Sequence, residues 1–167
     1  IGLDGLERAI AGGALERAVH DGSDRDARWQ MMMASTEGAY AFIKGLGAAH
    51  AMSHACGALP GLHLHHGTLN AVLLPLVLRY NADAAGDKMR RIARAMGLGA
   101  GDEIADFIAD LNRRIGLPES LAAMGVTTGM IDGLADAAVT DMASQTNPRP
   151  MERADYVSLF SEALDAD

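Results

Sequence analysis

The sequence predicts an all-α fold, a bundle of about seven or eight helices, on two observations. Strand signals are almost absent, because no stretch alternates β-branched with aromatic residues and no Asn-Gly hairpin turn occurs. Apolar residues instead recur at helical spacing along all 167 residues. With 49% hydrophobic and 22% charged residues, the chain has the composition of a folded globular protein. We therefore expect residues 1–167 to form a single all-α domain.

The N-terminal third is expected to contain a short helical pair followed by one long helix. Apolar periodicity begins at Ile1 and resumes beyond Gly12-Gly13. No capping residue precedes the first helix, so we expect the chain to be part of a longer protein. Ser23 and Asp26 resemble a capping box in which Asp replaces Glu. They predict a helical segment that runs from Ser23 to about Ala55.

Glycine and proline divide the rest of the chain. After a loop around Gly57–Gly61, a helix is expected from about Thr68 to Tyr80, and Pro75 should bend it. Asp102 is a suitable N-cap for an amphipathic helix that follows it. The remaining helices are expected at residues 83–96, 104–115, 118–124 and 127–139, with a last one after the turn at 147–150.

Composition and charge exclude several classes of protein. The 14 basic and 22 acidic residues give a net charge of −8, whereas a nucleic-acid-binding protein normally carries a basic stripe. The longest apolar run, Ala71–Leu78, is too short to cross a bilayer, and no secretory signal opens the chain, so no membrane partner is expected. The single cysteine, Cys56, cannot form an internal disulfide. A cytoplasmic location is therefore expected.

Histidines are concentrated in one segment, and five of the six lie between Gly45 and Asn81. His50 and His54 are four residues apart, so on a helix they stand one turn apart on the same face and can reach one divalent metal ion. His66 follows a loop that contains Gly and Pro, and it precedes Gly67, where the chain can turn back towards that face. The residues alone thus indicate a candidate histidine metal site in a helical domain.

Each of these residues also has a plain structural interpretation. A histidine on an apolar helix is more often a packed core or surface residue than a metal ligand. His63 and His65 are expected to face solvent or to support a ligand, and His20 to be exposed at a helix end. Cys56 is expected to be a small buried hydrophobic residue.

The segment from Gly45 to Asn81 resembles the signature of the iron-containing (group III) alcohol dehydrogenases. The signature is roughly G-L-G-x-x-H-x-x-x-H-x-x-G, a variable loop, and then H-G-x-x-N-A-x-x-L-P-x-V-x-x-x-N. The matching positions are Gly45, Gly47, His50, His54, Gly57, His66, Gly67, Asn70, Ala71, Leu74, Pro75, Val77 and Asn81. Residues 17–24 and the turn at 146–149 are also similar to the family, so the resemblance covers essentially the whole chain. It implies the helical C-terminal domain of these enzymes, which is dehydroquinate synthase-like.

The resemblance implies roles for three of the histidines. The first histidine of the signature and the histidine before Gly-x-x-Asn are metal ligands in the family, and they correspond to His50 and His66. His65 is the neighbouring candidate, but His66 is preferred because the Gly-x-x-Asn motif follows it in register. His54 would lie beside the nicotinamide as a catalytic and cofactor-binding residue, positioning the cofactor or relaying a proton.

The chain departs from the family pattern in two respects. The family completes its metal site with an Asp and a His four residues apart on an upstream helix. Asp4 and Arg8 have this spacing, but a guanidinium cannot bind a cation. The N-terminal α/β nucleotide-binding domain, with its glycine-rich loop, is absent from this sequence. We therefore expect the chain alone to hold half a metal site and to be inactive.

The implied reaction is hydride transfer between a small alcohol or aldehyde and NAD or NADP. A divalent metal, Fe²⁺ in most of the family and Zn²⁺ in some members, would polarise the substrate oxygen. The implied partners are the missing nucleotide-binding domain and a second copy in a homodimer. The alternative is a stand-alone, non-catalytic helical module whose histidines are structural or bind metal adventitiously. A metal-buffering protein is a weaker alternative, because it would need more ligands.

Overall fold

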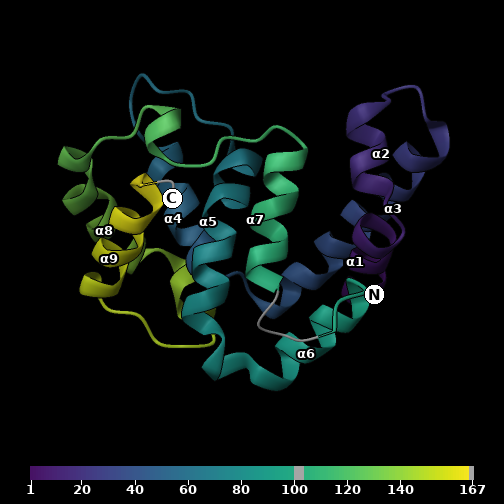
Figure 1. Cartoon of the computed structure of the whole chain (residues 1–167). Coiled ribbons are helices and arrows are strands. Elements are labelled where there is room, and N and C mark those ends of the chain that lie inside the picture. Colours follow the sequence, from purple (N-terminus) through teal and green to yellow (C-terminus); the bar gives the residue numbers. More distant parts are fainter. Residues whose placement is uncertain (100–103, 166–167) are drawn as a thin grey trace. The chain divides into compact units, whose positions relative to one another are not determined.

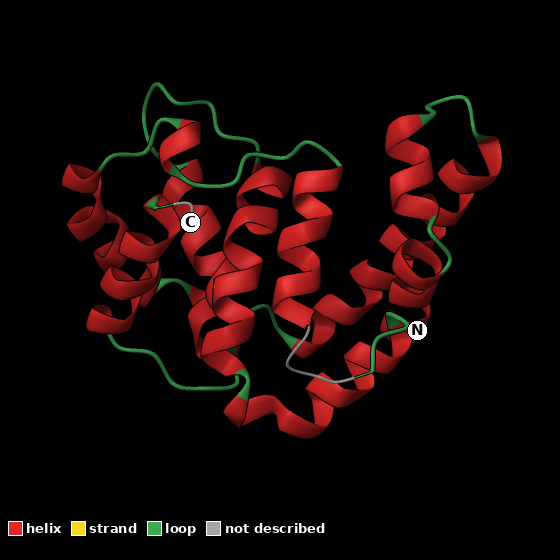
Figure 2. Cartoon of the chain, viewed as in Figure 1, coloured by secondary structure: helices red, strands yellow, loops and turns green. Residues whose placement is uncertain are grey.

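The computed structural model describes residues 1–99 and 104–165, and all regular elements in these ranges are helical (Figures 1 and 2). The prediction of an all-α fold is confirmed. The α-helices of the described residues are α1 (Gly2–Leu6), α2 (Ala14–His20), α3 (Arg25–Ala41), α4 (Ala48–Gly57), α5 (His66–Asn81), α6 (Gly86–Ala95), α7 (Ile104–Arg114), α8 (Ile131–Thr140) and α9 (Arg153–Leu164). A π-helical turn (Glu7–Ala11) follows α1, and 3-10 turns occupy Phe42–Lys44, Asp83–Ala85, Ala122–Met124, Thr128–Met130 and Met142–Thr146.

Contacts between the elements divide the chain into two compact units. The first contains residues 1–45 and 85–104, and the second contains residues 46–84 and 105–167. In the first unit α1 and α2 pack on α3, and α6 contacts α1. In the second unit α4 packs on α5 and α8, while α9 contacts α8 and α5.

The second unit holds the larger hydrophobic core, built from α4, α5, α8 and α9. Met52, Leu73, Tyr156 and Phe160 are completely buried in it. The Tyr156 hydroxyl lies 2.6 Å from Ser144 Oγ, so this buried aromatic side chain keeps a polar partner. This core holds α4 and α5, the two helices that carry the histidine signature.

The helix predicted from Ser23 to Ala55 is wrong, because the structure has two helices in different units. Helix α3 ends at Ala41, and a 3-10 turn leads to Gly45, whose φ of 98° takes the backbone out of the helical region. Helix α4 then begins at Ala48. The helical spacing of apolar residues continues across this break. Gly45, where the helical backbone ends, is also the last residue of this part of the first unit.

The predicted capping box at Ser23 is also wrong. Helix α3 begins one residue later, with Asp24 as its N-cap, and the Asp24 carboxylate accepts a hydrogen bond of 2.9 Å from the Ala27 backbone N–H. Ser23 instead donates from its hydroxyl and its backbone N–H to Asp21 Oδ1.

Helix α5 begins two residues earlier than predicted, because His65 serves as its N-cap. The Nδ1 atom of His65 accepts a hydrogen bond of 3.3 Å from the backbone N–H of Thr68. Pro75 lies inside the helix and is buried. It has no N–H for the carbonyl of Ala71 one turn earlier. The side-chain amide of Asn112 on α7 donates to that carbonyl at 2.7 Å, so the neighbouring helix supplies the missing hydrogen bond.

The other predicted helices are largely confirmed. Residues 83–96 form a 3-10 turn and α6, residues 104–115 form α7, and residues 127–139 form a 3-10 turn and α8. Of the helix predicted at 118–124, only the 3-10 turn Ala122–Met124 forms. The predicted N-cap Asp102 lies outside the described residues. Among the described helices, none combines the length and the apolar character needed to cross a membrane.

Candidate metal centre

Three histidines of the signature converge at one end of the α4–α5 pair. His50 and His54 stand one turn apart on α4, and His66 is the first residue of α5. The ring centroids of His50 and His66 are 5.2 Å apart, those of His54 and His66 are 5.4 Å apart, and those of His50 and His54 are 5.8 Å apart. The loop between the helices thus turns the chain back, as the Gly and Pro residues predict, and brings His66 to the histidine face of α4.

Helix α4 has one buried and one exposed side. Ala48, Ala51 and Ala55 are buried against the core, whereas the His54 side chain is 42% exposed. The start of α4 is fixed by Asn147, whose Oδ1 accepts a hydrogen bond of 3.2 Å from the Ala48 backbone N–H. The same side chain exchanges hydrogen bonds of 2.8 and 2.9 Å with Asn81 at the end of α5. The turn near the C-terminus therefore ties together the two histidine-bearing helices.

His66 is held by side chains from both helices. Its Nδ1 lies 2.8 Å from the hydroxyl of Ser53, a completely buried residue of α4. The amide nitrogen of Asn70, one turn along α5, donates to the His66 carbonyl at 2.9 Å and to Ser53 Oγ at 3.0 Å. It also lies 3.1 Å from His66 Nε2.

His54 is held by a carboxylate that lies 87 residues further along the chain. Its Nδ1 is 3.0 Å from Asp141 Oδ2, at the N-cap of the 3-10 turn Met142–Thr146. The other oxygen of Asp141 accepts a hydrogen bond of 2.7 Å from the Ala143 backbone N–H, which fixes the carboxylate. Asp141 thus orients the ring of His54 and directs a hydrogen to its Nδ1.

His50 is partly buried, and its electrostatic surroundings favour the neutral ring. Burial, followed by the nearby imidazoles of His66 and His54, lowers the pKa of His50 below its usual 6.5, although the Asp141 carboxylate opposes the shift. A neutral imidazole has a lone pair to offer, which is the form that binds a metal ion.

The other candidate residues lie outside this cluster. His20 ends α2 and is exposed, as predicted, and His63 and His65 are exposed in the loop before α5. Cys56 is fully buried, and burial raises the pKa of its thiol to about 12, so it is the small hydrophobic residue that the sequence predicts. Arg8 is engaged by Glu37 at 3.2 Å and by Gln30 at 2.9 Å.

The donor atoms of the cluster suit a transition metal but form only part of a ligand set. His50 and His66 offer imidazole nitrogens, which are typical ligands of Fe²⁺ and Zn²⁺. Within the described ranges, no group of three or more His, Cys, Asp and Glu side chains is arranged to hold a metal ion. The two imidazoles would therefore need further ligands to complete a site.

Comparison with known proteins decides the family. The profile of the Fe-containing alcohol dehydrogenase family, C-terminal part, matches residues 8–164. The chain belongs to this family. A 4-hydroxybutyrate dehydrogenase from Cupriavidus necator is 47% identical over 171 residues, which cover 98% of this chain and 44% of that protein. A lactaldehyde reductase from Escherichia coli K12 is 37% identical, over 92% of this chain and 42% of the relative.

A solved structure shows the same fold. The crystal structure of a 1,3-propanediol oxidoreductase superposes with a TM-score of 0.89 at 32% identity, covering 97% of this chain and 44% of that one. The chain thus spans less than half the length of the relatives that it matches.

Two residues that support the histidine cluster are not predicted from the sequence. Asp141 shows no local signal, because 87 residues separate it from His54. Ser53 stands next to His54 in sequence, where it looks like one more small residue on a helix. A signal for Ser53 does exist, because it lies one turn after His50 and therefore on the histidine side of α4.

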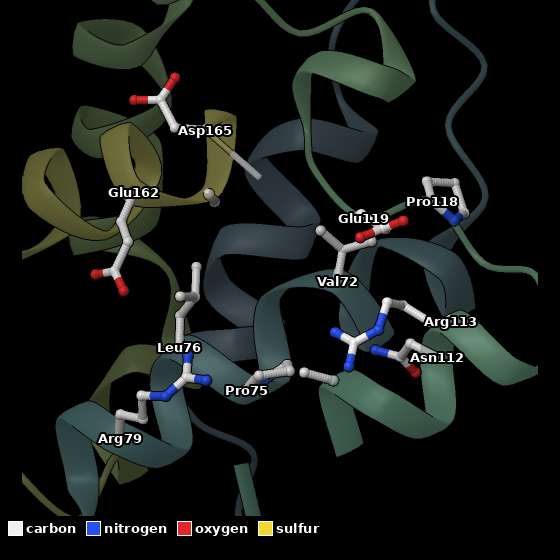
Figure 3. Close-up of a pocket in the computed structure, with 12 residues that line it drawn as sticks. Val72, Pro75, Leu76, Arg79, Asn112, Arg113, Pro118, Glu119, Glu162 and Asp165 are labelled. Atoms are coloured by element: carbon white, nitrogen blue, oxygen red, sulfur yellow. The ribbon is translucent and has the colours of Figure 1, made fainter. Parts of the chain in front are cut away.

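A separate cavity of about 300 Å³ lies between α5, α7 and α9 in the second unit (Figure 3). Arg79, Arg113, Glu119 and Glu162 contribute charged side chains to its wall, and the floor is apolar. None of the six histidines lines it. This cavity is therefore distinct from the candidate metal centre.

Proposed function

We propose that the chain is the metal-binding, catalytic helical domain of an NAD(P)-dependent alcohol dehydrogenase or aldehyde reductase. The observation that supports this most is the convergence of His50, His54 and His66, with ring centroids 5.2 to 5.8 Å apart. Membership of the Fe-containing alcohol dehydrogenase family supports the same reaction class.

In this proposal His50 and His66 are metal ligands, and the metal is Fe²⁺ or Zn²⁺. A bound metal ion would supply Lewis-acid polarisation of the substrate oxygen. The remaining ligands would be an Asp and a His on a helix that precedes these residues in the full-length protein. The chain alone would then be inactive, because it would hold only half of the ligand set.

His54 is proposed to act beside the nicotinamide, positioning it and moving a proton. Asp141 contacts Nδ1 of His54, so Nε2 is the nitrogen that can accept or release a proton. The side chain of His54 is 42% exposed, and a cofactor or substrate can therefore reach the ring.

The substrate is proposed to be a small alcohol or aldehyde. The relative at 47% identity is a 4-hydroxybutyrate dehydrogenase, which makes 4-hydroxybutyrate the first substrate to test. We further propose that the full-length protein is a cytoplasmic homodimer.

The competing proposal is a stand-alone helical module whose histidines are structural. The two proposals differ in what His66→Ala should do within a full-length dehydrogenase that carries this sequence. We expect kcat/KM for aldehyde reduction to fall by more than 100-fold, because loss of a ligand exceeds the 10- to 100-fold cost of losing a residue that supports one. Metal content should fall in parallel.

The matched control is His20→Ala, because this histidine is exposed and lies in the other unit. It should retain full activity and metal content. Wild-type turnover and normal metal content in His66→Ala would overturn the proposed function and favour the stand-alone module.

A further inference from the structure

The contacts around His66 distinguish its two ring nitrogens. Ser53 Oγ lies 2.8 Å from Nδ1, and the Asn70 amide nitrogen lies 3.1 Å from Nε2. The amide nitrogen also lies 3.0 Å from Ser53 Oγ, so the three side chains form a closed group. A neutral imidazole carries its hydrogen on one nitrogen only, and these neighbours determine which one.

The orientation of the Asn70 amide is fixed first. Its nitrogen donates to the His66 carbonyl at 2.9 Å, while Asn70 Oδ1 is buried without a hydrogen-bond partner among the described residues. Rotating the amide by half a turn would place that oxygen against the carbonyl, acceptor facing acceptor. The atom near Nε2 is therefore the N–H donor.

The donor beside Nε2 selects the tautomer of His66. A hydrogen on Nε2 would face the Asn70 N–H, donor against donor. A hydrogen on Nδ1 instead points at Ser53 Oγ and leaves a lone pair on Nε2 facing the amide. The Ser53 hydroxyl hydrogen can then turn to its own helix, as serines in helices do.

We propose that Ser53 and Asn70 are positioning residues that hold the hydrogen of His66 on Nδ1 and present the Nε2 lone pair to the metal. This inference rests on the proposed role of His66 as a ligand. Asn70 has two N–H groups for three nearby acceptors. Asn70 can donate one N–H to the His66 carbonyl and the other to Ser53 Oγ. Both amide hydrogens are then bonded, and the lone pair of His66 Nε2 is free to bind a metal ion.

The tautomer can be measured on the 167-residue chain without metal. At pH 8, long-range ¹H–¹⁵N correlation spectra of the imidazole rings distinguish a hydrogen on Nδ1 from one on Nε2. We expect the Nδ1–H form for His66, with exposed His20 as the internal reference. A hydrogen on Nε2 of His66 in the wild-type chain would overturn the proposal, whatever the variants do.

Two variants test the role of Ser53. Ser53→Ala removes the partner of Nδ1 and leaves Nε2 as the remaining acceptor for the second N–H of Asn70. The Nε2 lone pair should then stay engaged by the amide, and Co²⁺ affinity should fall about tenfold. Ser53→Thr keeps the hydroxyl and should retain the Nδ1–H form. Unchanged Co²⁺ affinity in Ser53→Ala would contradict the proposal.

The two readouts separate this inference from the proposed function. If the wild-type chain shows the expected tautomer but binds no Co²⁺, the tautomer assignment stands and the role of His66 as a ligand fails. If Co²⁺ binds through His66 but the tautomer is Nε2–H without metal, the proposed function stands and the positioning role fails.

Discussion

His54 and His66 each have Nδ1 in contact with an oxygen atom from elsewhere in the second unit. The partners are Asp141 Oδ2 at 3.0 Å and Ser53 Oγ at 2.8 Å. Because an imidazole has two nitrogens, these contacts leave Nε2 of each ring as the atom for chemistry. In His66 that atom is available to a metal ion, and in His54 it is available to a proton.

The carboxylate of Asp141 can be tested by its amide analogue. In Asp141→Asn the side chain keeps one oxygen, which would still accept the hydrogen bond from the Ala143 N–H. The new amide nitrogen would then face Nδ1 of His54. This should move the ring hydrogen to Nε2 and remove the proton-accepting function. In the full-length enzyme we expect kcat to fall by about 10²-fold.

Metal content is the control for this variant. It should stay at the wild-type level, because the hydrogen bonds of the Asp141 carboxylate go to His54 and to the Ala143 backbone N–H rather than to a proposed ligand. Unchanged kcat in Asp141→Asn would show that the Asp141 carboxylate does not govern His54.

At the scale of single residues, the sequence predicts the members of the histidine cluster better than the residues that support them. The spacing of His50 and His54 and the position of His66 are visible in the sequence, and the structure brings all three rings together. Asp141 cannot be found in this way, because its contact depends on how α8 and the 3-10 turn after it pack against α4.

Helix α5 contains a proline that would ordinarily leave a gap in its hydrogen bonding. The carbonyl of Ala71 loses its helical donor at Pro75, and Asn112 of α7 replaces it at 2.7 Å. A second contact between these helices joins Arg79 to Asp106 at 2.8 Å. The proline of the signature is therefore coupled to a residue on another helix.

This coupling predicts a non-additive pair of substitutions. Asn112→Ala should lower the free energy of unfolding by about 1–3 kcal/mol, because the partly buried carbonyl of Ala71 is left without a donor. In a Pro75→Ala background, residue 75 regains an N–H for that carbonyl, and the cost of Asn112→Ala should fall by about 1 kcal/mol. Urea unfolding of the four variants measures the difference.

The four-variant cycle contains its own control, since packing lost at position 75 cancels between backgrounds. Equal costs of Asn112→Ala in both backgrounds would mean that the amide does not replace the helical hydrogen bond.

Helix existence is more predictable than helix boundaries in this chain. Apolar spacing identifies α7 and α9 well, but it runs through Gly45 without a sign of the break between α3 and α4. The break depends on the positive φ of Gly45 and on Asn147. The side chain of Asn147 accepts a hydrogen bond from the first N–H of α4, although the two residues are 99 positions apart in the sequence. Long-range contacts of this kind leave no local pattern.

At the scale of the whole molecule, the fold class and the family predicted from the sequence are both confirmed. The described residues are helical throughout their regular elements, and the family profile covers residues 8–164. The division into two units was not predicted, because it depends on which helices pack together rather than on local periodicity. The family match supports the proposed reaction class, and the geometry of the histidine cluster supports the proposed metal ligands.

The most direct test of the account is calorimetric titration of the metal-free 167-residue chain with Zn²⁺. We predict saturable binding of one ion per chain, with affinity reduced at least tenfold in His50→Ala and in His66→Ala and unchanged in His20→Ala. Wild-type affinity in both of the first two variants, or an equal loss in His20→Ala, would contradict the assignment of His50 and His66 as this chain's share of the metal site.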